Sequence, residues 1–213
     1  MKIGVFDTGK GGEIVASNLQ KNFPEHEFLI VDDQKNAPYG TKSAMEIRRL
    51  TKEAIRPLLD CPIIIVACNT ATTVAIEYLR TIYPRIKFIG FEPAIKSTAM
   101  ATKTNKIMVL ATPATLNSKR YKSLKKKFLR GLEIFEPDCS SWAIRIDQGE
   151  FSDSDLAAVA EIVHRENIDQ VVLGCTHYLA LEKRISEKLP KVQIQNPISA
   201  VVRQLDKIIS EKL

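Results

Sequence analysis

The sequence predicts an α/β protein built from two similar doubly wound parallel-sheet halves, and three observations support this fold class. Short β-branched apolar runs alternate with helical segments along the whole chain. Runs such as Ile63–Ala67 and Gln170–Leu173 do not alternate polar with apolar residues, which is typical of parallel strands covered on both faces. The segment KIGVFDT at Lys2 resembles KIMVLAT at Lys106, and a second pair of strand ends matches at nearly the same offset. Together these observations favour a duplicated, doubly wound architecture.

The predicted strands are the apolar runs, and the predicted helices fill the segments between them. The expected strands are Lys2–Phe6, Phe28–Val31, Ile63–Ala67, Lys87–Phe91, Lys106–Ala111, Leu132–Phe135, Gln170–Leu173 and Val192–Ile194. The expected helices are Ser43–Leu59, Ala71–Ile82, Asp153–Glu166 and Ala180–Leu189. Ser43 ahead of Glu46, and Ser152 ahead of Asp155, predict capped helix starts.

The duplication also predicts the domain organisation. We expect one half to comprise residues 1–95 together with 199–213, and the other to comprise residues 96–198. Two halves related by a pseudo-twofold axis leave a cleft between them, which is the natural place for a ligand. Chance similarity is the alternative explanation of the repeat, because short strands share a β-rich composition.

The composition limits the class of protein. With 213 residues, 45% of them hydrophobic and 26% charged, the chain is typical of a globular protein rather than a disordered or fibrous one. No apolar stretch approaches the roughly 20 residues of a membrane span, and no signal-peptide pattern opens the chain, so we expect a cytoplasmic protein. The four cysteines show no CxxC spacing, which predicts free thiols and neither a metal site nor a disulfide framework.

A net charge of +6 raises the question of nucleic-acid binding. The basic excess is concentrated in Lys119–Arg130, where Tyr121, Leu124 and Phe128 recur at helical spacing. The lysines therefore fit the solvated face of an amphipathic helix better than a nucleic-acid site.

Polar residues cluster after the predicted strands, where the carboxyl ends of parallel strands meet ligands. The clusters after the strands of the first half are Asp7-Thr8-Gly9, Pro38-Tyr39-Gly40-Thr41 and Cys68-Asn69-Thr70; those of the second half are Thr112 with Thr115, and Cys175-Thr176-His177. The glycine-rich DTGKGG after the first strand matches neither the dinucleotide fingerprint nor the P-loop, so it fits a tight turn at least as well as a phosphate site.

Cys68 and Cys175 hold equivalent positions in the two repeats. A single free cysteine beside a buried strand is more often a small core residue than a nucleophile, but a pseudo-twofold axis would bring these two face to face across the cleft. Inverting an α-carbon requires an acid and a base on opposite faces, so the pair predicts a two-thiol racemase. Asp7 and His177 are candidate proton partners, and helices starting after both cysteines would stabilise a thiolate.

Six motifs in order along the chain, FDTGKGG, NAPYGTK, ACNTAT, FEPA, ATPAT and GCTHY, resemble those of glutamate racemases within the aspartate/glutamate racemase superfamily. The resemblance spans nearly the whole chain. It implies a cofactor-independent racemisation of glutamate for peptidoglycan synthesis, with Cys68 and Cys175 as bases assisted by Asp7 and His177. His177 itself favours glutamate, since aspartate racemases of the superfamily usually carry Glu there.

The resemblance also implies the residues that surround the substrate. It places these around the carboxylates and amine of the amino acid: Thr8, Tyr39, Gly40, Asn69, Thr70, Thr112, Thr115 and Thr176. Asp147 stands where the family often has an active-site Glu, which makes it a supporting residue with a shorter reach. Most of these groups are neutral donors, which suits an acidic ligand held by hydroxyls and helix-end amides.

The chain departs from the family pattern at Thr8, usually Ser, and at Lys10, Glu13 and Leu179. Family members also continue past the segment NPISAVVRQL, so we expect either a compact variant with a more exposed first half or one completed by a second copy in a homodimer. Two alternatives to glutamate racemisation stay open: racemisation of another acidic amino acid such as aspartate, and a catalytically silent amino-acid-binding regulatory protein.

Overall fold

The computed structural model describes residues 1–211 and contains two four-stranded sheets whose neighbouring strands are all parallel. The first sheet has the order β2-β1-β3-β4, from β1 (Lys2–Asp7), β2 (Glu27–Asp32), β3 (Ile63–Val66) and β4 (Lys87–Gly90). The second has the order β6-β5-β7-β8, from β5 (Lys106–Ala111), β6 (Glu133–Phe135), β7 (Gln170–Gly174) and β8 (Gln193–Gln195). The two orders are equivalent, which confirms the predicted pair of similar α/β halves.

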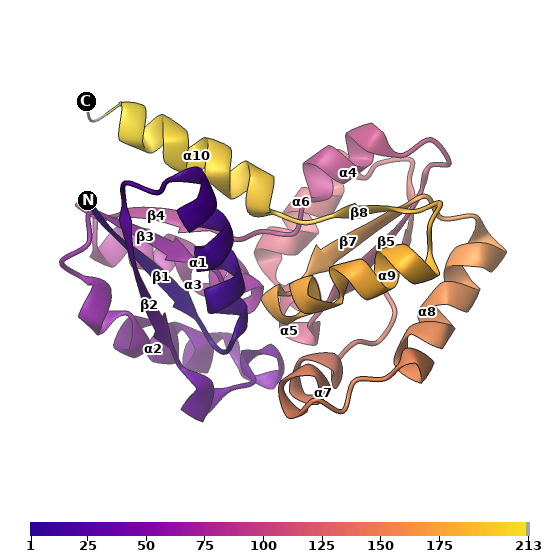
Figure 1. Cartoon of the computed structure of the whole chain (residues 1–213), viewed down its shortest axis with the longest axis horizontal. Coiled ribbons are helices and arrows are strands. Elements are labelled where there is room, and N and C mark those ends of the chain that lie inside the picture. The colour runs from indigo at the N-terminus through magenta and orange to yellow at the C-terminus, as the bar shows by residue number, and fades with distance from the viewer. Residues whose placement is uncertain (212–213) are drawn as a thin grey trace.

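Helices connect and cover the strands of both sheets (Figure 1). They are α1 (Gly11–Asn22), α2 (Ala44–Ala54), α3 (Asn69–Ile82), α4 (Ile95–Ala101), α5 (Pro113–Asn117), α6 (Lys119–Phe128), α7 (Trp142–Gln148), α8 (Asp153–Glu166), α9 (Glu182–Lys188) and α10 (Ile198–Ser210). Short 3₁₀ helices are η1 (Gln34–Asn36), η2 (Tyr39–Thr41), η3 (Arg56–Leu58) and η4 (Thr176–Leu181). No helix within residues 1–211 is both long and apolar enough to cross a membrane.

Three of the four predicted helices have different bounds in the structure, and the one expected over Ala71–Ile82 begins two residues earlier, at Asn69. The helix expected over Ser43–Leu59 ends at Ala54 and is followed by η3, which contains Pro57. Proline lacks the N–H that a continuing α-helix needs, so the chain changes to 3₁₀ geometry there. The helix expected from Ala180 begins at Glu182, because η4 occupies the preceding residues. The predicted cap at Ser43 is present, with its hydroxyl accepting a hydrogen bond from the Glu46 N–H.

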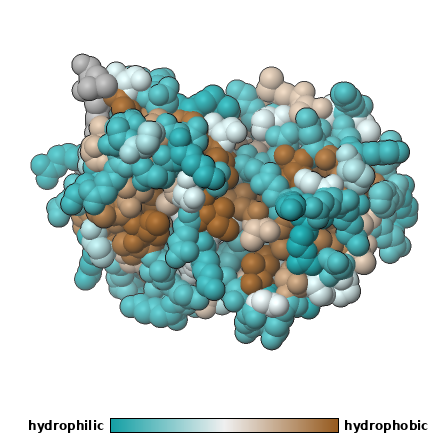
Figure 2. Space-filling model, viewed as in Figure 1, coloured by the Kyte–Doolittle hydropathy of each residue, from teal (hydrophilic) through white to brown (hydrophobic). Residues whose placement is uncertain are grey.

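The centres of both sheets are fully buried, as the uninterrupted apolar runs predict. Every residue of β3 and β7 is buried, because helices cover both faces of these strands. On the outer surface, α6 exposes four of its five lysines while Tyr121 is buried, so the basic segment is an amphipathic helix. Figure 2 shows hydrophilic side chains over most of one face, with apolar side chains visible mainly in hollows between the helices.

The last helix of each half crosses to the other half. Helix α4 follows β4 of the first sheet but contacts β7 and α6, whereas α10 follows β8 of the second sheet and contacts α1 and β4 (Figure 1). The two halves therefore contact each other through α4 and α10. The predicted domain boundaries stay a prediction, and residues 212 and 213 of the first half lie outside the described residues.

Candidate active site

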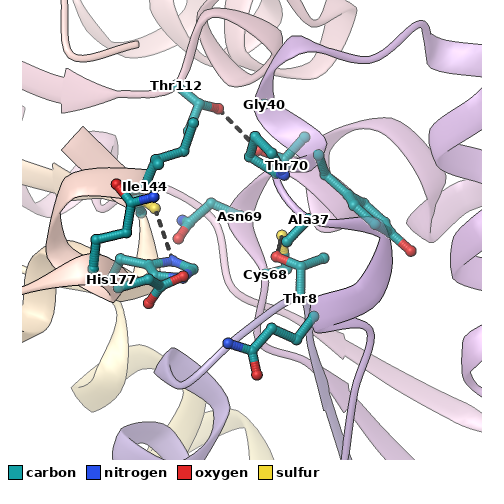
Figure 3. A pocket seen from close by; sticks show the side chains of 16 residues that line it. Thr8, Ala37, Gly40, Cys68, Asn69, Thr70, Thr112, Ile144 and His177 are labelled. Atoms are coloured by element: carbon teal, nitrogen blue, oxygen red, sulfur yellow. Dashed lines mark hydrogen bonds and ion pairs between the residues drawn. The ribbon is translucent and has the colours of Figure 1, made fainter. Parts of the chain in front are cut away.

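A cavity of about 270 Å³ lies between the two halves and is lined from both of them. Its walls contain most of the polar residues that follow the strand ends (Figure 3). The lining residues are Thr8, Gln34, Ala37, Pro38, Tyr39, Gly40, Cys68, Asn69, Thr70, Thr112, Ala143, Ile144, Asp147, Gln148, Cys175 and His177. A cavity near 300 Å³ is at the small end of ligand sites, which suits a ligand of amino-acid size.

Cys68 enters the cavity from the first half, where it follows β3 and caps the N-terminus of α3. Its Sγ accepts hydrogen bonds at 3.5 Å from the Thr8 hydroxyl and from the Ala71 N–H. Burial and the nearby Asp7 carboxylate raise the pKa of the Cys68 thiol to about 12, although the two hydrogen bonds act in the opposite direction. Cys68 is therefore a protonated thiol at neutral pH in this state.

Cys175 enters from the second half, at the equivalent position after β7, but its surroundings differ. The helix that follows it is the short 3₁₀ helix η4, and the Cys175 side chain makes no capping hydrogen bond to it. A helix therefore follows each cysteine, as the sequence predicts, but only Cys68 caps its helix through the thiol. Instead, the Cys175 Sγ lies 3.6 Å from Nδ1 of His177 (Figure 3).

His177 links Cys175 to Asp147, a residue of α7. Its Nε2 lies 3.1 Å from Oδ2 of Asp147, and the His177 side chain is only 7% exposed. Burial alone would lower the pKa of His177, but the contacts with Asp147 and Cys175 outweigh it and raise the pKa to about 11. An imidazolium in this position can donate a proton to the Cys175 sulfur.

Asp7 is fully buried behind the wall formed by Thr8 and Cys68 and does not line the cavity. Its Oδ1 accepts a hydrogen bond from the Thr8 N–H at 2.7 Å, whereas Oδ2 has no partner among the described residues. Burial raises the pKa of Asp7 to about 6, and the charge of His177 is the main opposing effect. A carboxyl with this pKa can exchange protons near neutral pH.

Asn69 presents an unpaired acceptor. Its Nδ2 donates to the carbonyl oxygen of Phe91 at 2.7 Å, while its Oδ1 is buried without a partner in the described part of the chain. Because Asn69 lines the cavity, this arrangement leaves an oxygen for an ammonium or hydroxyl of a ligand.

Three threonine hydroxyls, one from the first half and two from the second, form hydrogen bonds with one another between the halves. The Thr70 hydroxyl lies 2.8 Å from that of Thr112 (Figure 3). It also lies 3.4 Å from the hydroxyl of Thr115. Of the three, Thr115 is fully buried behind the wall rather than in the lining. Thr176 also lies outside the lining, where it packs so closely on Gly11 that a Cβ there would be 2.5 Å from its side chain.

The structure adds cavity residues that the sequence patterns do not single out. Gln34 follows β2, and Ala143, Ile144 and Gln148 come from α7, which covers the cavity from the second half. The charged departures Lys10 and Glu13 are exposed and lie outside the lining. Within residues 1–211, no group of three or more potential metal ligands is present.

Comparisons with known proteins agree on one family. The sequence profile described as Asp/Glu/Hydantoin racemase matches residues 13–205. The glutamate racemase of Clostridium novyi is 36% identical, with 100% of this chain and 85% of the relative aligned. The glutamate racemase of Pseudomonas aeruginosa strain PAO1 is 33% identical, over 99% of this chain and 82% of the relative.

Solved structures of glutamate racemases resemble the whole fold. The Escherichia coli glutamate racemase in complex with L-glutamate and the activator UDP-MurNAc-Ala has a TM-score of 0.84 at 26% identity, covering 98% of this chain and 82% of that one. The Francisella tularensis glutamate racemase in complex with D-glutamate has a TM-score of 0.82 at 30% identity, covering 99% and 81%. These two similar structures thus hold opposite enantiomers of glutamate, L-glutamate in one and D-glutamate in the other.

Proposed function

Because this chain belongs to the Asp/Glu/Hydantoin racemase family, we propose that it interconverts L-glutamate and D-glutamate without PLP. The observation that carries this proposal is the pair of cysteines, Cys68 and Cys175, which line one cavity from equivalent positions in the two halves. The reaction supplies D-glutamate for peptidoglycan, which is the role of the glutamate racemases within this family.

The proposed chemistry uses the two thiols on opposite faces of the α-carbon. One cysteine acts as a thiolate and removes the α-proton, and the other acts as a thiol and delivers a proton from the opposite face. The reverse reaction exchanges the two roles. Asp7 assists Cys68 as a proton acceptor, and His177, held by Asp147, assists Cys175.

The cavity walls suit an amino acid with two carboxylates. Lysine and arginine are absent from the described lining, so hydroxyls and backbone amides at helix ends would hold the carboxylates. In the same proposal, Asn69 Oδ1 accepts a hydrogen bond from the substrate ammonium. The other neutral contacts would come from Thr8, Tyr39, Gly40, Thr70 and Thr112, with Thr115 and Thr176 supporting them from behind.

The negative charge that forms at the α-carbon spreads onto the neighbouring carboxylate in the transition state. Donors that are already oriented stabilise this charge without reorganisation. The threonine hydroxyls are oriented by their mutual hydrogen bonds, and Thr112 also caps α5. This preorganisation explains how the site can act on a weakly acidic α-proton without a cofactor.

We also propose that the protein is cytoplasmic. All four cysteines are free and buried, which suits a reducing compartment. Cell fractionation with a tagged full-length chain tests this location.

The experiment for the proposed activity is proton NMR of the purified protein with L-glutamate, and separately L-aspartate, in D₂O under reducing conditions. Loss of the α-proton signal of glutamate, together with D-glutamate in chiral analysis, is the expected result. Faster exchange and inversion of aspartate than of glutamate would reassign the substrate. Silence with both substrates, from a folded protein with reduced thiols, would contradict racemisation of acidic amino acids.

A further inference from the structure

Asp33 is a buried carboxylate close to the cavity but outside its lining. It follows β2, is only 4% exposed, and receives hydrogen bonds on both oxygens. The Tyr39 hydroxyl donates to Oδ2 at 2.6 Å, and Asn36 Nδ2 donates to Oδ1 and Oδ2 at 2.8 and 3.0 Å. No lysine or arginine in the described chain forms an ion pair with it.

A buried carboxylate without a cation carries a large desolvation cost, which its hydrogen bonds must offset. The main chain of Asp33 is fixed as well, because its N–H donates to the carbonyl oxygen of Asp7 at 3.1 Å. The main chain of Asp33 is therefore held at the carboxyl end of β1, next to Asp7 and Thr8, which support Cys68. From this anchor its side chain reaches outward to the loop that contains Tyr39.

Tyr39 connects Asp33 to the cavity wall, because it binds Asp33 through its hydroxyl and is itself part of the lining. The Tyr39 ring is buried, and its centroid lies 6.4 Å from that of Phe6 in β1. Burial and the Asp33 carboxylate raise the pKa of Tyr39 above its ordinary value, so the phenol keeps its proton and remains a donor. The ring and the hydroxyl thus hold the loop at two points.

The anchored loop closes the cavity against the second half. Pro38, Tyr39 and Gly40 all line the cavity. Gly40 approaches Thr112 so closely that a Cβ at Gly40 would lie 2.9 Å from the Thr112 Cβ. A small outward movement of the loop would therefore open the wall at the place where the two halves meet (Figure 3).

We propose that Asp33 is a positioning residue for substrate binding, because its carboxylate holds the Tyr39 hydroxyl and thereby sets the Pro38–Gly40 wall of the cavity against Thr112. The kinetic part of this proposal rests on the proposed racemase activity. The wall contacts the substrate in the ground state and the transition state alike, so its loss weakens binding more than it slows the chemical step.

The kinetic test compares Asp33→Asn, Tyr39→Phe and the double variant. Each single variant raises KM for glutamate about tenfold and leaves kcat within about twofold. Tyr39→Phe removes the hydroxyl, whereas Asp33→Asn replaces its charged acceptor with a neutral amide whose NH2 group faces the amide of Asn36. The double variant is no worse than either single variant, because both act through the same contact. Asp32→Asn is the matched control: Asp32 is the exposed neighbouring carboxylate, and this variant keeps wild-type KM.

A reciprocal exchange tests whether the hydrogen-bond pattern matters rather than the charge alone. In Asp33→Asn combined with Asn36→Asp, the new amide can donate to the new carboxylate and still accept from the Tyr39 hydroxyl. This variant recovers most of the lost substrate affinity. A fall in kcat at unchanged KM, or additive losses in the double variant, would assign Asp33 a merely structural role and overturn the proposal.

A readout that needs no substrate separates this proposal from the proposed function. Amide hydrogen exchange of a peptide covering residues 37–41 should accelerate about tenfold in Asp33→Asn and Tyr39→Phe, and should stay at the wild-type rate in Asp32→Asn. Unchanged exchange in both folded variants would show that Asp33 does not hold the wall. Inactivity of the wild type towards glutamate would contradict the racemase assignment, and the exchange rates would still decide the role of Asp33.

Discussion

The Nε2 atom of His177 lies 3.1 Å from Oδ2 of Asp147, while the other ring nitrogen of His177 faces the Cys175 sulfur at 3.6 Å. This geometry makes His177 the bridge between a carboxylate on α7 and a thiol after β7. The sequence resemblance predicts a shorter reach for Asp147 than for the Glu of the family pattern, and the distance shows that this side chain still contacts the imidazole. The hydrogen bond with Asp147 is the largest of the contacts that raise the pKa of His177.

Asp147→Asn should lower the pKa of His177 from about 11 towards its ordinary value of 6.5, because the main stabilisation of the imidazolium is removed and burial then dominates. The resulting neutral imidazole is a poorer proton donor to Cys175, so kcat should fall by about 10²-fold at pH 8. NMR titration of the His177 ring protons and steady-state kinetics measure the two effects. Asp206→Asn, at an exposed carboxylate on α10, is the control, and a His177 pKa that stays near 11 in Asp147→Asn would contradict this account.

Cys68→Ser and Cys175→Ser should each reduce racemisation by at least about 10³-fold, since a serine hydroxyl is too weak an acid to replace a thiol near neutral pH. Binding of glutamate, measured by calorimetry, should change little because the hydroxyl occupies a similar volume. Each variant keeps one thiol, and that thiol serves one face of the α-carbon. Solvent-deuterium exchange without inversion should therefore persist with only one enantiomer per variant, and near-normal inversion in either variant would exclude the two-thiol mechanism.

Much of the fold follows from local sequence patterns, because most strands are short apolar runs that polar residues follow. The structure places strands at every predicted run, and Lys106–Ala111 has the predicted bounds. The equivalence of Lys2–Asp7 with Lys106–Ala111 follows from the repeat, since both strands lie second in their sheets. Helix ends are harder to predict, as Pro57 shows, because a 3₁₀ turn can continue the apolar pattern of an α-helix.

The site is predictable where residues follow strands and unpredictable where tertiary packing decides. Ile144 and Gln148 lie on the short helix α7, which carries no strand-end pattern and reaches the cavity only through the packing of α7 on η4. Conversely, Thr115 and Thr176 follow strands but are turned behind the wall. The burial that raises the pKa of Cys68 to about 12 also depends on both halves, so no local motif reveals it.

Asp7→Asn should change the pH dependence of stability in a defined direction. The pKa of Asp7 is raised from 3.8 to about 6, so the folded protein binds the Asp7 proton more tightly than the unfolded chain. Its contribution to stability is complete below pH 3.8 and is lost as the pH rises through about 6. Relative to the wild type, the free energy of unfolding of Asp7→Asn should therefore increase by about 2 kcal/mol between pH 4.5 and pH 7.5.

Urea denaturation of the wild type and Asp7→Asn at several pH values measures this difference. In the same pair, the acidic limb of kcat/KM near pH 6 should be present in the wild type and absent from the residual activity of the variant, because Asp7 must be ionised to accept a proton. A constant difference in stability across the window would mean that Asp7 titrates near its ordinary pKa.

Thr8→Ala and Thr8→Ser should separate the role of the Thr8 hydroxyl from that of its methyl group. The hydroxyl donates to the Cys68 sulfur at 3.5 Å and lowers the pKa of that thiol, opposing the effect of burial. Removing it in Thr8→Ala should raise the Cys68 pKa further and reduce kcat about tenfold, because the thiolate loses a hydrogen bond. Thr8→Ser keeps the donor and should retain activity within about threefold of the wild type.

The pH dependence of iodoacetamide alkylation, followed by mass spectrometry of the peptide containing Cys68, reports the ionisation of the Cys68 thiol directly. Equal alkylation profiles in the two variants would show that Thr8 affects the site through its volume and not through its hydrogen bond.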